Sequence, residues 1–196
     1  EPTSMAVVDA HKGPVRWQVD VEGRAAHSSM APLGVNAITY AGRLLAELER
    51  MEQELKARPP DPRFDPPYTT LQVTRMEAGT ANNIVPNACW LGFEIRALPG
   101  CDPADIERRL MTFAEEHCLP EMRAVAAEAD ITMRRTNEVP AFAAESASEV
   151  VALALKLSES NETHAVSYAT EAGLFQRGGS PAVVCGPGDI AQAHTA

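Results

Sequence analysis

Apolar and polar side chains alternate along four segments of the chain, which is the pattern of a β-strand with one buried face. These segments are Val15–Glu22, Thr69–Met76, Cys89–Leu98 and Ala129–Arg135. Two intervening segments instead repeat apolar residues every three to four positions, as an amphipathic α-helix does. The pattern therefore predicts the order strand, helix, strand, strand, helix, strand.

Both predicted helices have recognisable first residues. Residues 36–56 form the first helix, with Asn36 as a suitable N-cap and an apolar face of Ile38, Ala41, Leu45, Leu48 and Met51. Asp102 and Pro103 begin the second helix, because Asp is a good N-cap and Pro fits the first helical position. A proline-rich stretch before Tyr68 excludes regular structure between the first helix and the second strand.

This order predicts the α+β fold class, with a ferredoxin-like β-α-β-β-α-β unit over residues 13–138. Both helices would cover one face of a four-stranded antiparallel sheet. After residue 138 the predicted elements alternate between helix and strand. They are a helix at Ala147–Ser158, a strand at His164–Ala169, a helix at Ala172–Arg177 and a strand at Ala182–Cys185. Two strands cannot close an α/β domain, so we expect residues 1–12 and 139–196 to be an incomplete α/β portion.

Composition narrows the classes of function. The formal net charge of −10 argues against a nucleic-acid partner, whose phosphates require a basic surface. An RNA-binding sheet would also need exposed aromatic residues on its strands, and few are present. No apolar run reaches the roughly 18–20 residues that cross a bilayer, so we expect no membrane partner. The four scattered cysteines favour reduced thiols and a cytoplasmic protein.

Four stretches carry polar residues that periodicity does not explain. His27 follows the first strand, and a turn with Asn82 and Asn83 joins the second and third strands. Arg96 lies beside Glu94 on the third strand. Read without further context, His27 is a locally bonded loop residue, the Asn pair forms an ordinary turn, and Arg96 and Glu94 are a salt bridge on the solvent face.

The fourth stretch, Cys185 to His194, follows a predicted buried strand. It would lie at the carboxyl end of an α/β sheet, where such folds place their ligands. A histidine after two glycines there is a candidate metal ligand.

Taken together, these stretches resemble the di-zinc amidohydrolases. The matching motifs are Glu-Pro-Thr at residues 1–3 with His-Lys-Gly at 11–13, Ala-His-Ser-Ser at 26–29, Gly-Thr-Ala-Asn-Asn-Ile-Val-Pro at 79–86, and Gly-Pro-Gly at 186–188 with Ala-His at 193–194. The family includes acetylornithine deacetylase, succinyl-diaminopimelate desuccinylase, aminoacylases and the carboxypeptidase G type. Thr-Glu-Ala-Gly at 170–173 with Gln-Ala-His at 192–194 is most similar to the acetylornithine deacetylase type.

The resemblance implies a role for each matching residue. Glu1 and His194 match ligands of two different metal ions, zinc or cobalt, and the remaining family ligands and the general base have no match here. We therefore expect an upstream part of the protein to lie outside this sequence, and no metal or an incomplete site in this chain alone. His27 matches a histidine that reaches the active site of the partner in a homodimer formed through the lid.

The substrate residues follow from the same resemblance. Asn82, Asn83 and Arg96 match lid residues that hold the substrate carboxylate, which suits the planar guanidinium fork of Arg. From its charge, we place Glu171 near an amino group of the substrate. The implied reaction removes the acetyl group from N-acetyl-L-ornithine in arginine biosynthesis. The alternatives are desuccinylation or deacylation of another N-acyl amino acid and, in a different class, a non-catalytic dimerisation module.

Overall fold

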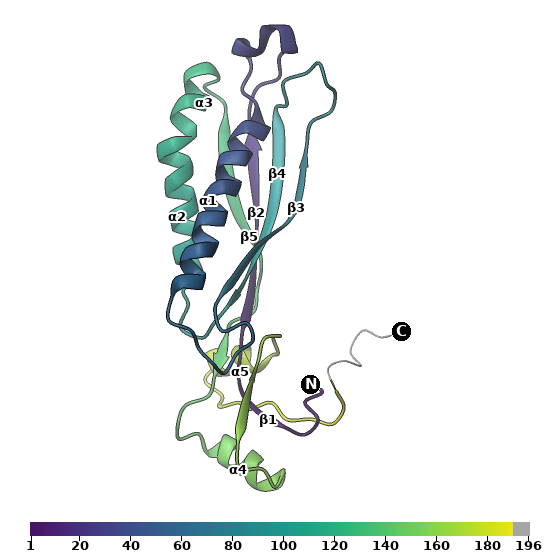
Figure 1. Ribbon diagram of the computed structural model, residues 1–196, viewed down its shortest axis with the longest axis vertical. Helices are drawn as coiled ribbons and strands as arrows, with labels where there is room; N and C mark the ends of the chain where they lie inside the picture. The colour runs from purple at the N-terminus through teal and green to yellow at the C-terminus, as the bar shows by residue number, and fades with distance from the viewer. Residues whose placement is uncertain (190–196) are drawn as a thin grey trace.

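The four alternating segments form one sheet in the computed structural model, which describes residues 1–189. The strands are β2 (Gly13–Glu22), β3 (Thr70–Ala78), β4 (Ala88–Ala97) and β5 (Asp130–Glu138). Their order is β3-β4-β2-β5, and all neighbours are antiparallel. The helices α1 (Ala37–Ala57), α2 (Pro103–His117) and α3 (Leu119–Val125) lie on one face of this sheet (Figure 1). The predicted ferredoxin-like arrangement is confirmed, and α3 is an addition to it.

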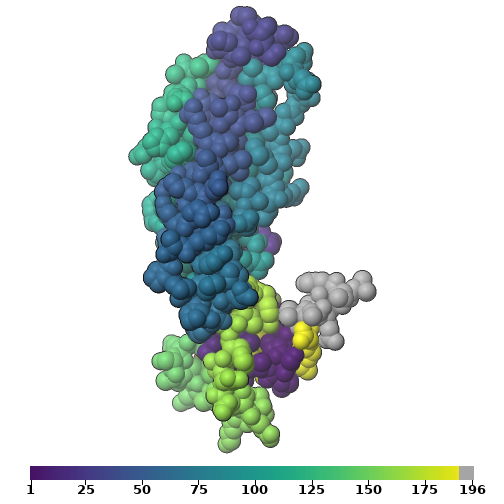
Figure 2. Space-filling view, in the orientation of Figure 1, coloured from purple at the N-terminus to yellow at the C-terminus, as the bar shows by residue number. Residues whose placement is uncertain are grey.

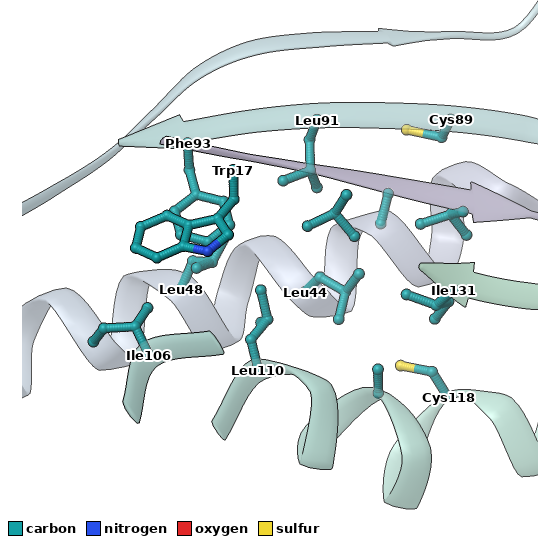
Figure 3. Packing of buried hydrophobic residues seen from close by; sticks show 14 of the residues in the cluster. Trp17, Leu44, Leu48, Cys89, Leu91, Phe93, Ile106, Leu110, Cys118 and Ile131 are labelled. Atoms are coloured by element: carbon teal, nitrogen blue, oxygen red, sulfur yellow. The ribbon is translucent and has the colours of Figure 1, made fainter. Parts of the chain in front are cut away.

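The core of this layer lies between the sheet and its helices (Figure 3). Trp17 of β2 stacks on Phe93 of β4, with ring centroids 5.0 Å apart. Leu44 and Leu48 of α1 and Leu110 of α2 are buried against the same strands. Burial alternates along β2 and β4, as their sequences require of strands with one helix-covered face.

Side chains cap both helices where the sequence predicts. Asn36 Oδ1 accepts hydrogen bonds from the backbone N–H groups of Ile38 and Thr39, at 3.0 and 3.4 Å. Asp102 Oδ1 accepts one from the Ala104 N–H at 2.9 Å, and proline occupies the first turn of α2. Each cap satisfies backbone donors that the first helical turn leaves unpaired.

A smaller sheet has the order β6-β1-β7, formed by β6 (Phe142–Ala143), β1 (Val7–His11) and β7 (Thr163–Val166). Strand β1 is antiparallel to β6 and parallel to β7. The helix α4 (Glu149–Leu157) contacts β1 of this sheet, and α5 (Ala172–Arg177) contacts β6. The sequence did not predict β1 or β6.

The predicted strand over Ala182–Cys185 is wrong. Within the described residues this segment makes one isolated bridge, from Val184 to Val8, rather than a ladder. An apolar run is therefore not sufficient for a strand, because backbone pairing along the run is also required.

The molecule is elongated, with the two sheets at opposite ends (Figures 1 and 2). We call β2–β5 with α1–α3 the large unit, and β1, β6, β7, α4 and α5 the small unit. Only Lys12 separates β1 from β2 along the chain. The domain boundaries expected at residues 13 and 138 stay a prediction, although β2 starts and β5 ends there. No helix within residues 1–189 combines the length and apolar character of a membrane span.

Candidate functional site

At the far end of the large unit, two of the polar stretches come together. His27 precedes the short 3-10 helix η1 (Ser28–Leu33), and its Nδ1 lies 2.8 Å from Ser29 Oγ. The Ser28 N–H donates to the Asn83 carbonyl at 2.9 Å, and His27 forms an isolated bridge with Ile84. The structure therefore places His27 beside Asn82 and Asn83, and we call these three residues the tip group.

The tip group is open to solvent. His27, Asn82 and Asn83 are all exposed. A hollow of about 580 Å³ is lined by Asn82 of this group, and also by Ser28 and the turn after β3. Polar side chains at a solvent-facing hollow are free to contact a ligand or another protein chain.

At the opposite end of the large sheet, where the two units meet, His11 ends β1 and is fully buried. Its Nδ1 lies 2.9 Å from the Lys12 carbonyl, which can only accept, so Nδ1 carries the proton. Within the described residues, Nε2 is buried and has no hydrogen-bond partner. Burial lowers the pKa of His11, while the Lys12 carbonyl and the carboxylates of Glu171 and Glu1 act in the opposite direction. We call Glu1, His11 and Glu171 the base group, a name that refers only to their position at the base of the large sheet and not to acid–base chemistry.

The sequence reading assigned no role to His11, although it lies in one of the matching motifs. A histidine among the apolar residues of Val-Val-Asp-Ala-His was the available signal. Because the segment lacks regular alternation, its sequence pattern does not identify it as a strand or His11 as a buried group.

Glu1 is held next to the predicted ligand-bearing stretch that begins at Cys185. The Thr3 N–H donates to the Gly186 carbonyl at 3.1 Å, and the Gly186 N–H donates to Thr3 Oγ1 at 3.1 Å. A Cβ atom on Gly186 would lie 2.4 Å from the Glu1 carbonyl oxygen, so glycine is required for this approach. The two chain segments lie together in Figure 2. His194 itself lies outside the described residues.

Arg96 belongs to neither group. It lies near the start of the large unit, where its register partners are Pro14 and Thr70. Its Nε lies 2.7 Å from Glu94 Oε1, and the other oxygen of Glu94 lies 2.5 Å from Arg16 Nε. The salt bridge on the sheet surface, which the sequence left open as an alternative, is therefore present.

No three His, Cys, Asp or Glu side chains within residues 1–189 come together as a group that could hold a metal ion. Glu1 is one carboxylate, whereas a zinc ion takes about four ligands. The described residues alone do not fit a metal centre.

The tip group and the base group are separated by the length of the large sheet (Figure 1). Strand β2 runs ten residues from Gly13, near the base group, to Glu22, near the tip. At a rise of about 3.3 Å per residue, it spans about 30 Å. A small substrate bound at the base group therefore cannot reach the tip group of the same chain.

Sequence comparisons identify relatives along the whole chain. Residues 9–122 match the M20 peptidase dimerisation domain. The chain is 34% identical over 200 residues to acetylornithine deacetylase from Myxococcus xanthus, covering 99% of this chain and 50% of that protein. It is 33% identical over 194 residues to acetylornithine deacetylase from Yersinia pestis, covering 99% of this chain and 48% of that protein. The chain thus spans about half the length of the curated relatives it matches.

Solved structures show the same fold. Aminopeptidase PepT from Bacillus cereus superposes with a TM-score of 0.68 at 23% identity, covering 94% of this chain and 46% of that one. A tripeptidase from Staphylococcus aureus superposes with a TM-score of 0.63 at 20% identity, covering 95% and 46%. At these identities the likeness concerns the fold alone. Because the dimerisation-domain match extends over more than half of the chain, this protein belongs to the M20 family.

Proposed function

We propose that the whole protein is a metal-dependent amide hydrolase that removes the acetyl group from N-acetyl-L-ornithine. Support comes from relatives named acetylornithine deacetylase, which match 99% of this chain at 32–34% identity. In this reaction water adds to the acetyl carbonyl carbon, the C–N bond then breaks, and the amine leaves with a proton. The products are acetate and ornithine.

We further propose that two copies associate through α1 and the edge strand β3. The family match to a dimerisation domain supports this association. Strand β3 has one sheet neighbour, and Met76 on it and Ile38 at the start of α1 are 42% and 40% exposed. An edge strand with unpaired backbone groups and exposed apolar side chains is stabilised by pairing with a two-fold mate.

The observation that carries the proposal is the distance of about 30 Å between the tip group and the base group, estimated from the length of β2. Because one chain cannot use both groups on one small substrate, we propose that the tip group serves the active site of the partner. There His27 would donate a hydrogen bond to the oxyanion that forms when water adds to the carbonyl.

The remaining residues receive roles from their chemistry and position. Asn82 and Asn83 would reach the partner's substrate together with His27. Arg96 would bind the substrate carboxylate once Glu94 releases part of its guanidinium. Glu171, exposed in the base group, would accept hydrogen bonds from a substrate ammonium.

Metal ligation by Glu1 and His194 stays a prediction. We infer that the small unit belongs to a larger α/β domain of the whole protein. Exposed apolar side chains on its helices support this inference, among them Leu157 at 75% and Phe175 at 61% exposure. The four cysteines are free thiols, which accords with the proposed cytoplasmic location.

Mixed dimers of the full-length protein test the role of His27 in the partner's site. One subunit carries His27→Ala, and the other carries Glu1→Ala with His194→Ala. If His27 acts across the dimer, the His27→Ala subunit receives the partner's histidine and keeps its activity, while both homodimers lose about 10²–10³ or more in kcat. His117→Ala, an exposed histidine on α2, is the matched control with unchanged activity. An inactive mixed dimer contradicts the proposal.

Substrate comparison tests the reaction itself. We expect the full-length protein to have a higher kcat/KM for N-acetyl-L-ornithine than for N-succinyl-diaminopimelate or other N-acetyl amino acids. Glu171→Gln should raise KM for acetylornithine and leave KM for an uncharged N-acetyl amino acid nearly unchanged. A preference for the succinylated substrate would support the alternative function.

The alternative of a non-catalytic dimerisation module is tested on the 196-residue chain. We expect this chain to hydrolyse none of these amides and to bind zinc at most weakly in calorimetry. A stoichiometric, tightly bound metal pair in the purified chain would contradict this expectation.

A further inference from the structure

The two units are joined by chain segments that cross in direct backbone contact. One connection is Lys12, and the other is the segment Val139–Ala141 between β5 and β6. A Cβ atom on Gly13 would lie 2.3 Å from the Ala141 nitrogen, and one on Gly173 would lie 2.3 Å from the Pro140 carbonyl oxygen. The second connection is therefore packed between two glycines, which leaves it little room to move as a free hinge.

Lys12 contacts both units at this crossing. Its backbone N–H donates to the Val166 carbonyl of β7 at 3.2 Å, on the small unit. Its ammonium donates to the carbonyls of Pro66 and Tyr68 at 2.6 and 2.8 Å, both in the proline-rich loop between α1 and β3. The side chain is fully buried, and its Nζ lies 5.9 Å from the centre of the Phe64 ring.

A second hydrogen bond attaches the same loop to the small unit. Ser167, just after β7, donates from Oγ to the Asp65 carbonyl at 2.6 Å. Phe64, between these contacts, is only 3% exposed. The loop over residues 58–69 is therefore held at three carbonyl acceptors: that of Asp65 by Ser167 beside the small unit, and those of Pro66 and Tyr68 by Lys12 between the units.

Burying a lysine is costly unless its ammonium is satisfied, so its presence here needs a compensating gain. Two charge-assisted hydrogen bonds to backbone carbonyls supply that gain, and each is stronger than a neutral bond. An exposed contact also links the units, because Glu138 at the end of β5 pairs with Arg177 on α5. Solvent-exposed ion pairs of this kind contribute little. Lys12 thus donates two charge-assisted hydrogen bonds to the loop, whereas Ser167 donates one neutral hydrogen bond.

We propose that Lys12 is a positioning residue that fixes the loop over residues 58–69 to the junction and thereby sets the orientation of the large unit relative to the small unit. Its consequence for catalysis rests on the proposed function. There, the orientation of the large unit would decide where the tip group enters the partner's active site.

Limited trypsin digestion of the 196-residue chain tests the attachment. The Arg63–Phe64 bond lies in the held loop, so cleavage requires the loop to open. Lys12→Met removes both ammonium hydrogen bonds, and we expect cleavage at Arg63 to accelerate about tenfold to a hundredfold. Lys156→Met, on exposed α4, is the matched control with an unchanged rate. Cleavage of Lys12→Met at the control rate would overturn the proposal.

Ser167→Ala keeps the proposal testable should Lys12→Met fail to fold. Ser167 contributes one hydrogen bond from the molecular surface, so we expect the fold to persist and cleavage at Arg63 to accelerate about threefold to tenfold. General unfolding is recognised by equally faster cleavage after Arg109, which lies within α2. An unchanged rate at Arg63 in Ser167→Ala would also count against the attachment.

A distance measurement tests the orientation. Nitroxide labels are placed at Thr80→Cys near the tip and Ala152→Cys on α4, with Cys101 and Cys185 replaced by serine. Pulsed electron resonance should give a narrow distance distribution with Lys12 and a clearly broader one with Lys12→Met. Identical distributions would overturn the proposal. Neither cleavage nor distance depends on activity, so this failure is distinguishable from failure of the proposed deacetylation.

Discussion

The large and small units bury their apolar residues to very different extents. In the large unit, three helices and four strands enclose a continuous core that includes Trp17, Leu44 and Phe93 at 0–1% exposure. The small unit has a core cluster of four buried residues, Val8, Phe142, Ala172 and Val184. Helix α4 buries none of its residues, and its Leu153 and Leu157 are 55% and 75% exposed.

The large unit therefore provides most of the stability, whereas the base group lies in the small unit. Hydrophobic burial is the main favourable term in folding, so the large unit holds most of the stability of this chain. The base group lies in the small unit, where little apolar surface is buried. We expect the small unit to open locally at a lower free energy than the large unit, which hydrogen exchange would show as weaker protection of β1 and β7 than of β2 and β4.

The largest expected effect tests the stability of the large unit. Leu44→Ala removes a fully buried side chain between α1 and the sheet, so the free energy of unfolding should fall by about 2–5 kcal/mol. Urea denaturation followed by circular dichroism measures the change. Leu153→Ala on α4 should change it by less than about 0.5 kcal/mol. Equal effects of the two substitutions would contradict the contrast between the units.

A substitution at the junction tests whether the units are coupled. Gly13→Ala places a methyl group 2.3 Å from the Ala141 nitrogen and 2.5 Å from the Val139 carbonyl oxygen, so we expect a loss of about 1–3 kcal/mol. Gly42→Ala is the control, because its methyl group meets nothing within 4 Å on α1. It should stabilise the protein by about 0.5–1 kcal/mol. Thermal unfolding of both variants gives the comparison, which fails if Gly13→Ala is neutral.

A smaller effect is expected at the first turn of α1. Asn36→Ala removes the acceptor for the N–H groups of Ile38 and Thr39 and should cost about 1 kcal/mol. Asn36→Asp keeps an acceptor and should recover most of that loss. Chemical denaturation measures the free energy of unfolding of both variants. If Asn36→Asp is as unstable as Asn36→Ala, the lost N-cap hydrogen bonds are not the cause of the destabilisation.

The smallest expected effect concerns pH and the small unit. Burial lowers the pKa of His11 below its ordinary value of about 6.5, so below that pH the unfolded chain binds a proton that the folded chain resists. The stability contributed by neutral His11 should therefore be present well above pH 6.5 and decrease as the pH falls below that value, first in the hydrogen-exchange protection of β1. His11→Gln should weaken this dependence. A loss of protection at β1 that is independent of pH in this range would contradict the expected sign.

The two units also differ in how far the sequence predicts them. Each strand of the large sheet has one helix-covered face, so alternation alone located β2 to β5 to within three residues at each end. Strand β1 is buried at Val7, Val8, Ala10 and His11, which removes the alternation, and β6 has only two residues. The run Ala182–Cys185 shows the opposite failure, since its apolar residues lack a continuous pairing partner.

The candidate site was predictable as a set of residues and not as an arrangement. The motifs located His27, Asn82 and Asn83, which the fold brings together at the tip. Their distance from Glu1 and Glu171 depends on where the small unit packs relative to β2, which no local pattern contains. The buried state of His11 depends on β6 and β7 pairing on either side of it, and both are distant in sequence.

The single-residue link between β1 and β2 also limits how this protein can change in length. Side chains alternate between faces along a strand, so one residue inserted beside Lys12 would turn every following side chain of β2 to the opposite face. Trp17 would then leave the core, and a charged neighbour would enter it. Insertions and deletions should therefore be tolerated in surface loops without a proposed role, such as residues 144–148 between β6 and α4, and excluded at residues 11–14. The length of the chain between β1 and β2 is therefore constrained during evolution.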